Sequence, residues 1–165
     1  MTSLSQASVT DNYLAAVDMG SNSFHFVLAR VVNDVMQIMH TEKFRVKLAD
    51  GLDENNILSE QAIKRGVLAL ESFGSATKEL DKSNIKVVAT YTLRNARNAQ
   101  DFLDAAAKVF PFDIEIISGH EEARLIYQGV AHNTEPNGRR LVMDIGGGST
   151  ECIIGEDHHI NTLAS

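Results

Sequence analysis

The sequence predicts an α/β protein whose sheet is mixed and opens with an antiparallel three-strand meander. Apolar and β-branched runs, which favour strands, fill most of residues 14–40. From residue 59 to residue 132, segments with helical periodicity alternate with short apolar runs, the pattern of strands joined by crossover helices. Two further apolar runs near the C-terminus flank a turn that repeats the first turn of the chain. The predicted order is β-β-β-α-β-α-β-α, followed by β-β.

The opening meander is predicted at residues 14–18, 24–32 and 35–40. The turn Gly-Ser-Asn-Ser separates the first two strands, and the short turn Asn33-Asp34 suits a tight hairpin between the second and the third. Residues 41–58 mix polar and apolar positions around the loop ADGLDENN, and we make no prediction for their secondary structure.

The first helix is predicted to begin after Ser59, because serine is a favourable N-cap residue. Ile63, Val67, Leu70 and Phe73 recur at spacings of four, three and three residues. This periodicity places the four side chains in one apolar stripe.

A buried strand is predicted at residues 85–90, and a second helix follows it. This helix is capped by Asn98 and ended by Pro111, which cannot continue a helix. Its periodicity predicts four inward positions: Phe102, Ala105, Ala106 and Val109. A further strand is predicted at residues 113–117.

The third helix, at residues 118–132, opens with the capping box Ser118…Glu121, which assigns Glu121 a structural role. Two strands then surround the glycine turn within residues 140–157. No further strand or helix is predicted after them, and a lone hairpin is only marginally stable in water.

We therefore expect the hairpin to open a second domain that is cut short. The predicted organisation is a flexible N-terminus at residues 1–13, a first domain at residues 14–133 and the opening hairpin of a second domain at residues 134–165. The alternative is that the hairpin joins the edge of the first sheet or a neighbouring chain.

The composition excludes some function classes. The net charge of −7 disfavours a nucleic-acid binder, but it leaves room for an anionic substrate beside a metal ion or local arginines. The first 13 residues are polar and lack the regions of a signal peptide, and no apolar run approaches the ~20 residues of a membrane span. A cytoplasmic protein with neither a nucleic acid nor a membrane as its partner is predicted.

Two matching turns are the most informative feature. Residues 15–23 read AAVDMGSNS and residues 141–149 read LVMDIGGGS, with Asp, Gly and Ser in register. Gly and Ser in a tight turn expose backbone N–H groups to a phosphate, and hydroxyl and amide side chains add donors. Asp18 and Asp144, at the strand ends, would repel phosphate unless they hold a cation such as Mg²⁺ directly or through water.

One glycine-rich hairpin turn is more often only a turn, whereas two matched copies favour two related domains with a site between them. Both turns lead into strands and match neither the dinucleotide fingerprint nor the P-loop, so these two binding modes are rejected.

Three other side chains are candidates for the site. Glu122 is either an inward carboxylate or a first-turn acid that favours the helix dipole, and its position alone does not decide between them. Arg94 and Arg97 follow a buried strand, where ligand groups gather in open α/β sheets, although a loop arginine is usually only solvated.

Together these motifs resemble the exopolyphosphatase and guanosine-pentaphosphate phosphatase (Ppx/GppA) family, within the superfamily of actin, sugar kinases and the Hsp70 ATPase. The matching segments follow the family's order through nearly the whole chain: AVDMGSNSFHFVLARV at 16–31, KLADGL at 47–52, ATYTLRNARNA at 89–99, IISGHEEARLIYQGV at 116–130 and LVMDIGGGSTE at 141–151. The resemblance implies two ribonuclease-H-like domains around a deep cleft, with one phosphate loop from each domain.

The resemblance also implies site roles. Glu122 matches the family's catalytic base, which activates the attacking water, and Arg94 matches a phosphate-contacting arginine. The two loops supply the phosphate-binding positions Ser21, Asn22, Ser23, Gly146, Gly147, Gly148, Ser149 and Thr150. The metal-associated set is Asp144 and Glu151, which match acidic positions of the second loop, and Asp18, which ends the first strand.

The implied activity is exopolyphosphatase, the Mg²⁺-assisted release of terminal orthophosphate from inorganic polyphosphate. The resemblance leaves open whether a monovalent cation such as K⁺ is a second cofactor. Removal of the 5′ γ-phosphate of guanosine pentaphosphate (pppGpp) is nearly indistinguishable from these residues, although KLADGL and GGGSTE favour polyphosphate. A third reading is a non-catalytic actin-like module that binds a nucleotide or alarmone, but no purine site is visible. The resemblance implies a homodimer for the full-length protein, and we expect this chain alone to be inactive because one wall of the cleft would be missing.

Overall fold

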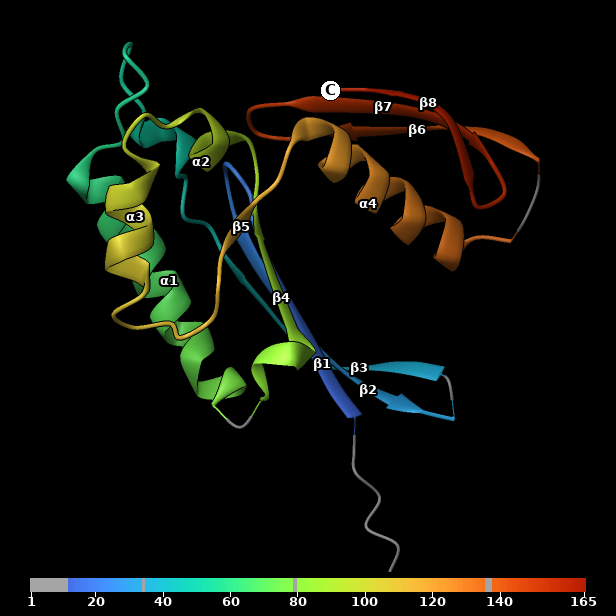
Figure 1. The fold of residues 1–165 in the computed structure, drawn as a ribbon, viewed down its shortest axis with the longest axis horizontal. Helices are drawn as coiled ribbons and strands as arrows, with labels where there is room; N and C mark the ends of the chain where they lie inside the picture. The colour runs from blue at the N-terminus through green and yellow to red at the C-terminus, as the bar shows by residue number, and fades with distance from the viewer. Residues whose placement is uncertain (1–11, 34, 79, 136–137) are drawn as a thin grey trace, which may run out of the picture.

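The computed structural model describes residues 12–33, 35–78, 80–135 and 138–165 as two sheets with four α-helices (Figure 1). The strands are β1 Asn12–Met19, β2 Phe24–Val32, β3 Val35–Phe44, β4 Ile85–Ala89, β5 Glu115–Ile116, β6 Arg139–Ile145, β7 Thr150–Glu156 and β8 His159–Ala164. The helices are α1 Glu60–Thr77, α2 Tyr91–Asn95, α3 Ala99–Ala106 and α4 Gly119–Asn133, with short 3-10 turns at Ala49–Gly51 and Lys82–Asn84. Most of the predicted flexible segment, residues 1–13, lies outside the described residues.

The first sheet confirms the predicted meander and mixed topology. Its strand order is β3-β2-β1-β4-β5, in which β1 pairs antiparallel with β2 and parallel with β4. The third strand continues to Phe44, four residues beyond the prediction, while β5 has only two of the five predicted residues. The register brings the C-terminal ends of β1 and β4 to the same edge, next to the first glycine turn.

Helices α1 and α3 lie together on one face of this sheet (Figure 1). Ser59 caps α1 as predicted, because its hydroxyl accepts a hydrogen bond from the Ala62 N–H at 3.4 Å. Of the predicted apolar stripe, Leu70 and Phe73 are buried and Ile63 packs against the core, whereas Val67 is only half-buried. Gly66 lies at the centre of the contact with α3, where a Cβ would approach Cε2 of Phe102 to 2.5 Å. The absence of a side chain there lets α1 and α3 pack closely.

Two details of the region after β4 differ from the prediction. The side chain of Asn98 stands at the start of α3 but makes no capping bond; it binds the backbone N–H and C=O of Leu58 instead. The helix ends at Ala106, well before Pro111, and the helix α2 was not predicted. Asn98 therefore stabilises a contact between distant segments, and Pro111 does not end the helix.

The second sheet corrects the prediction that nothing follows the last hairpin. β8 pairs antiparallel with β7, so the sheet has the order β6-β7-β8 and repeats the opening meander. It forms its own sheet and does not join the edge of the first one. The strand β8 begins at His159, directly after the turn formed by Asp157 and His158.

Helix α4 packs against one face of the second sheet (Figure 1). Its inward residues Ala123, Tyr127 and Ala131 form a small core with Ile153. On the opposite face of the sheet, large apolar side chains remain exposed: Leu141, Met143, Ile145 and Ile154. Among the described residues no helix is long and apolar enough to cross a membrane.

Candidate functional site

The two glycine turns have the same backbone geometry. In the first turn the Gly20 N–H donates to the carbonyl of Ser23 at 3.1 Å, and in the second the Gly146 N–H donates to the carbonyl of Ser149 at 3.0 Å. A Cβ on either glycine would approach that serine oxygen to 3.0 or 3.2 Å, which explains the need for glycine at this position. The sequence repeat is therefore also a structural repeat.

The two turns lie directly against each other. A Cβ on Gly147 would lie 3.2 Å from Cβ of Asn22 and 3.3 Å from Cβ of Ser21. A Cβ on Gly148 would overlap the ring of Tyr91 and lie 2.9 Å from Oγ of Ser21. The predicted glycines 147 and 148 thus permit the close approach of the second turn to the first turn and to α2.

The first turn is held by the segment 46–49, which contains the start of the KLADGL motif. The Lys47 N–H donates to the carbonyl of Asn22 at 2.8 Å, and the Ala49 N–H donates to the carbonyl of Ser21 at 3.0 Å. Arg65 of α1 fixes this segment in turn, because its guanidinium donates to the carbonyls of Val46 and Lys47 at 2.8 and 2.9 Å. KLADGL therefore braces the backbone of the first turn.

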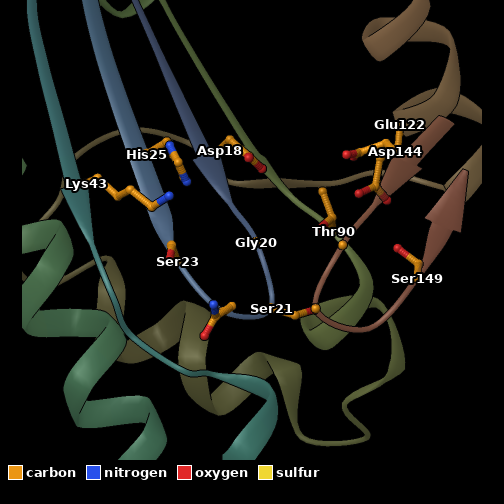
Figure 2. A pocket seen from close by; sticks show the side chains of 13 residues that line it. Asp18, Gly20, Ser21, Ser23, His25, Lys43, Thr90, Glu122, Asp144 and Ser149 are labelled. Atoms are coloured by element: carbon orange, nitrogen blue, oxygen red, sulfur yellow. The ribbon is translucent and has the colours of Figure 1, made fainter. Parts of the chain in front are cut away.

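A polar cleft of about 250 Å³ opens between the turns (Figure 2). It is lined by Asp18, Gly20, Ser21, Asn22, Ser23, His25, Lys43, Thr90, Glu122, Asp144, Gly146, Gly147 and Ser149. Eight predicted site residues and the predicted base Glu122 are in this lining. Four predicted site residues are not in it: Arg94, Gly148, Thr150 and Glu151.

Glu122 is the carboxylate that α4 brings into the cleft. Ser118 caps this helix by accepting from the Glu121 N–H at 3.1 Å. The reciprocal half of the predicted capping box is not formed, because the Glu121 carboxylate binds Arg124 instead, at 2.6 and 2.7 Å. Glu122 takes no part in the cap, and its Oε2 lies 3.2 Å from Nη1 of Arg94 on α2. Arg94 therefore lies behind the base, as its ion-pair partner.

The pKa of Glu122 is raised from its ordinary value of 4.5. Burial is the largest cause, and the nearby carboxylates of Glu151 and Asp18 add to the rise, while Arg94 opposes it. An apolar recess lined by Ile117, Leu125 and Ile126 adjoins the carboxylate and accounts for the lost hydration. A raised carboxylate pKa in a cleft suits a general base, which must accept a proton near the operating pH.

Asp18 and Asp144 extend from the ends of corresponding strands, β1 and β6, into the same cleft. Burial at the base of the cleft raises the pKa of Asp18, His25 lowers it, and Asp144 raises it. The two carboxylates therefore lie near enough to repel each other, which a cation between or beside them would relieve.

The donor set fits Mg²⁺ better than a metal that needs a protein cage. The described part of the chain contains no cluster of three or more His, Cys, Asp or Glu groups around one point. Mg²⁺ needs no such cluster, because it keeps waters and takes one or two carboxylates together with substrate phosphates. Asp18 and Asp144 can supply these hard oxygen ligands from the cleft surface.

Glu151 lies behind the cleft and is fully buried. Its Oε1 accepts a hydrogen bond from the Ser165 hydroxyl at 3.0 Å, and its Oε2 has no hydrogen-bond partner among the described residues. An unpartnered buried carboxylate oxygen is costly and calls for a ligand such as water or a cation. The oxygen is thus available to hold a water near Glu122.

Four lining residues were not among the predicted site residues: Gly20, which belongs to the recognised first turn, and His25, Lys43 and Thr90. His25 could have been predicted from the repeat, because it follows the first turn at the same position at which Glu151 follows the second turn. The register pairs Asp18 with His25 and Asp144 with Glu151. Lys43 gave no such signal, since its strand was predicted to end at residue 40.

Two matched turns at the ends of two sheets, around a cleft with an inward carboxylate, define an α/β fold of the actin-like, ribonuclease-H-like type. A chain of a PilM–PilN pilus biogenesis complex shares this fold alone, with a TM-score of 0.55 at 9% identity. More similar are an exopolyphosphatase from Cytophaga hutchinsonii (TM-score 0.86, 32% identity, 92% of this chain and 49% of that chain) and the Ppx/GppA protein of Aquifex aeolicus (TM-score 0.80, 28% identity, 92% and 50%).

Residues 27–165 match the model of the Ppx/GppA phosphatase family, and the chain belongs to this family. It is 54% identical over 144 residues to a Haemophilus influenzae protein provisionally named an exopolyphosphatase, covering 87% of this chain and 45% of that protein. It is 49% identical over 151 residues to a guanosine-5′-triphosphate,3′-diphosphate pyrophosphatase of Vibrio atlanticus, covering 92% and 30%. The chain therefore spans less than half the length of these curated relatives.

Proposed function

We propose that the site hydrolyses a terminal phosphoanhydride bond and that the substrate is inorganic polyphosphate, from which orthophosphate is released. The observation that carries this proposal is the position of Glu122: a half-buried carboxylate with a raised pKa, lining the same cleft as both glycine turns. The family match and the exopolyphosphatase relatives support the same reaction class.

In the proposed mechanism, Glu122 takes a proton from a water that attacks the terminal phosphorus. As the new P–O bond forms, the bridging P–O bond breaks and its electron pair leaves with the shortened chain. The backbone N–H groups of the two turns and the hydroxyls of Ser23 and Ser149 hold the oxygens of the transferred group. Arg94 orients the Glu122 carboxylate. Mg²⁺ held by Asp18 and Asp144 would supply charge neutralisation of the phosphate oxygens.

The alternative substrate is pppGpp, because relatives at 49% identity are named guanosine-5′-triphosphate,3′-diphosphate pyrophosphatases. Both substrates end in the same phosphoanhydride, so the cleft between the turns does not distinguish them. The recess beside Glu122 is lined by Ile117, Leu125 and Ile126 together with Asp18, Thr90 and Asp144, so it does not exclude a nucleotide either. Polyphosphate remains the preferred substrate in this proposal.

The chain alone is expected to be inactive, because one face of its second sheet is uncovered. Activity is therefore tested on this chain extended by the C-terminal remainder of the Haemophilus relative, referred to below as the completed protein. Phosphate release with Mg²⁺ is measured from long-chain polyphosphate and from pppGpp at matched phosphate concentration. Faster release from polyphosphate supports the proposal, and preference for pppGpp selects the alternative.

The decisive variant is Glu122→Gln, which removes the base but keeps the shape of the side chain. It is expected to lower phosphate release by about 100-fold or more, the usual contribution of a general base. Glu121→Gln is the matched control, since Glu121 pairs with Arg124 and does not line the cleft. Equal release by wild type and Glu122→Gln would exclude Glu122 as the base and leave only a binding function.

A further inference from the structure

The cleft carries its positive charge on the side away from its carboxylates. In Figure 2, Glu122 and Asp144 lie on one side, Asp18 lies between, and His25 and Lys43 lie on the opposite side. A phosphate chain is negative along its whole length, so a group bound beside the carboxylates needs a cation there. A group bound on the opposite side meets a positive protein side chain directly.

Lys43 belongs to a row of side chains that crosses three strands. Asp18 lies opposite His25 on β1 and β2, and His25 lies opposite Lys43 on β2 and β3. Side chains at directly opposite positions share one face of a sheet, which explains why all three line the cleft. Neighbouring strands are about 4.8 Å apart, so the backbone of Lys43 lies roughly 10 Å from that of Asp18.

The charge of Lys43 is not neutralised within the described part of the chain, where it makes no ion pair with a carboxylate. Its neighbour Glu42 points to the other face of the sheet and contacts Nε2 of His40 at 2.7 Å. By contrast, Lys47 pairs with Asp50 at 3.6 Å, outside the cleft. Lys43 thus offers a full positive charge and three N–H donors to a ligand in the cleft.

We propose that Lys43 binds the phosphate groups on the leaving side of the scissile bond. This inference rests on the proposed function, because it takes the terminal phosphate to lie between the two turns and Glu122. The rest of the substrate then runs across β2 and β3 toward the ammonium group of Lys43. Because Lys43 lies across the cleft from Glu122 and Asp144, a substrate that reaches both sides extends beyond its terminal phosphate, so this residue selects linear phosphate chains over a single phosphate group.

The test measures binding of inorganic tripolyphosphate and of orthophosphate to this chain, each with Mg²⁺, by isothermal titration calorimetry. Lys43→Met is expected to weaken tripolyphosphate binding about tenfold or more, because charge-assisted hydrogen bonds to phosphate are lost. Its orthophosphate affinity is expected to stay within about twofold, since a single phosphate beside Glu122 and Asp144 lies on the opposite side of the cleft from Lys43. Lys43→Arg keeps the charge and is expected to retain tripolyphosphate affinity.

The control is Lys64→Met, which removes an exposed lysine on α1, outside the cleft, and both affinities are expected to be unchanged. Thermal unfolding checks that each variant folds, and Lys43→Gln replaces Lys43→Met if the latter does not. Equal loss for both ligands would place Lys43 at the terminal phosphate and overturn the proposal. Unchanged tripolyphosphate binding in Lys43→Met, or no tripolyphosphate binding by the wild-type chain, would overturn it as well.

The two proposals can fail independently. If Glu122→Gln abolishes phosphate release in the completed protein while Lys43→Met leaves tripolyphosphate affinity unchanged, the hydrolytic mechanism is supported and the proposed role of Lys43 is wrong. If tripolyphosphate binding depends on Lys43 but phosphate release does not depend on Glu122, Lys43 keeps its role and the hydrolytic mechanism is wrong.

Discussion

Nη1 of Arg94 lies 3.2 Å from Oε2 of Glu122, and the same nitrogen donates to the carbonyl of Ile117 at 2.8 Å. Arg94 belongs to α2 and Glu122 to the first turn of α4, so the contact ties the segment after β4 to the helix that carries the base. The two side chains are only 23% and 14% exposed, so water screens this pair less than it screens a surface pair. Arg94 therefore orients the carboxylate and favours its ionised form.

The pH dependence of phosphate release is expected to follow the ionisation of Glu122. A general base must be deprotonated, and the pKa of Glu122 is raised above its ordinary value of 4.5 by burial and by Glu151. Activity should therefore fall as the pH drops through a midpoint above 4.5. The midpoint is measured from kcat/KM of the completed protein between about pH 4 and pH 8.

Arg94→Met is expected to move this midpoint to higher pH, because Arg94 lowers the pKa of Glu122. Arg94→Lys keeps the charge and should move it less. Arg97→Met is the control, since Arg97 is exposed and does not pair with Glu122 among the described residues. A midpoint that stays fixed or falls in Arg94→Met would mean that the profile reports another group.

Gly148→Ala is expected to keep the second turn from closing on the first. The added methyl group would overlap the ring of Tyr91 and approach Oγ of Ser21 to 2.9 Å. Such overpacking costs about 1–3 kcal/mol, so tripolyphosphate should bind about tenfold more weakly. The double variant Tyr91→Ala, Gly148→Ala removes the ring and should recover affinity. Loss of affinity without recovery in the double variant would show that the ring is not the obstacle.

Local patterns in the sequence predicted most of the fold. Strand pairing around the first turn and the cap at Ser118 depend on residues close in sequence, and both are confirmed. Leu70 and Phe73 of the predicted stripe on α1 are buried, but the close contact with α3 lies at Gly66, because periodicity does not reveal which neighbour a helix meets. Gly66 is buried only because Phe102 of α3 fills the space above it. The strand β8 was missed because its turn contains polar residues without a tight-turn signature.

The site was predictable where two copies of a motif could be compared. Asp18 and Asp144 occupy equivalent strand ends, and both are found in one cleft. Lys43 could not be found this way, because its position depends on the register of an edge strand that includes a bulge near Leu28. The partner of Glu122 was equally hidden, since 28 residues separate it from Arg94 in sequence.

Arg65→Met is expected to weaken the brace behind the first turn. The guanidinium of Arg65 donates to the carbonyls of Val46 and Lys47, and this segment in turn donates to the carbonyls of Ser21 and Asn22. The loss of two charge-assisted hydrogen bonds at a partly exposed site should lower the free energy of unfolding by about 1–2 kcal/mol. Tripolyphosphate binding should weaken as well, because the turn loses its support.

Urea unfolding and calorimetry of Arg65→Met measure these two effects. The control is Arg45→Met, which removes an exposed arginine from the neighbouring segment. If Arg65→Met loses stability but binds tripolyphosphate as well as wild type, the segment supports the fold and has no effect on the turn.

Gly155→Ala tests the packing of α4 on the second sheet, on which the position of Glu122 depends. A Cβ at Gly155 would overlap the ring of Tyr127 and the carbonyl oxygen of His159. Tyr127 is fully buried, and its hydroxyl donates to the carbonyl of Asp157 at 3.1 Å, so its ring cannot move without losing that bond. The substitution is expected to lower the free energy of unfolding by about 1–3 kcal/mol.

The matched control is Gly129→Ala, the same change on the outer side of α4, where no atom lies within 4 Å of an added Cβ. Alanine there should raise stability by about 0.5–1 kcal/mol, because glycine weakens a helix interior. In the completed protein, Gly155→Ala should also lower phosphate release, since a displaced α4 carries Glu122 away from the cleft. Full release by a destabilised Gly155→Ala would mean that Arg94, and not the packing of α4, fixes the carboxylate.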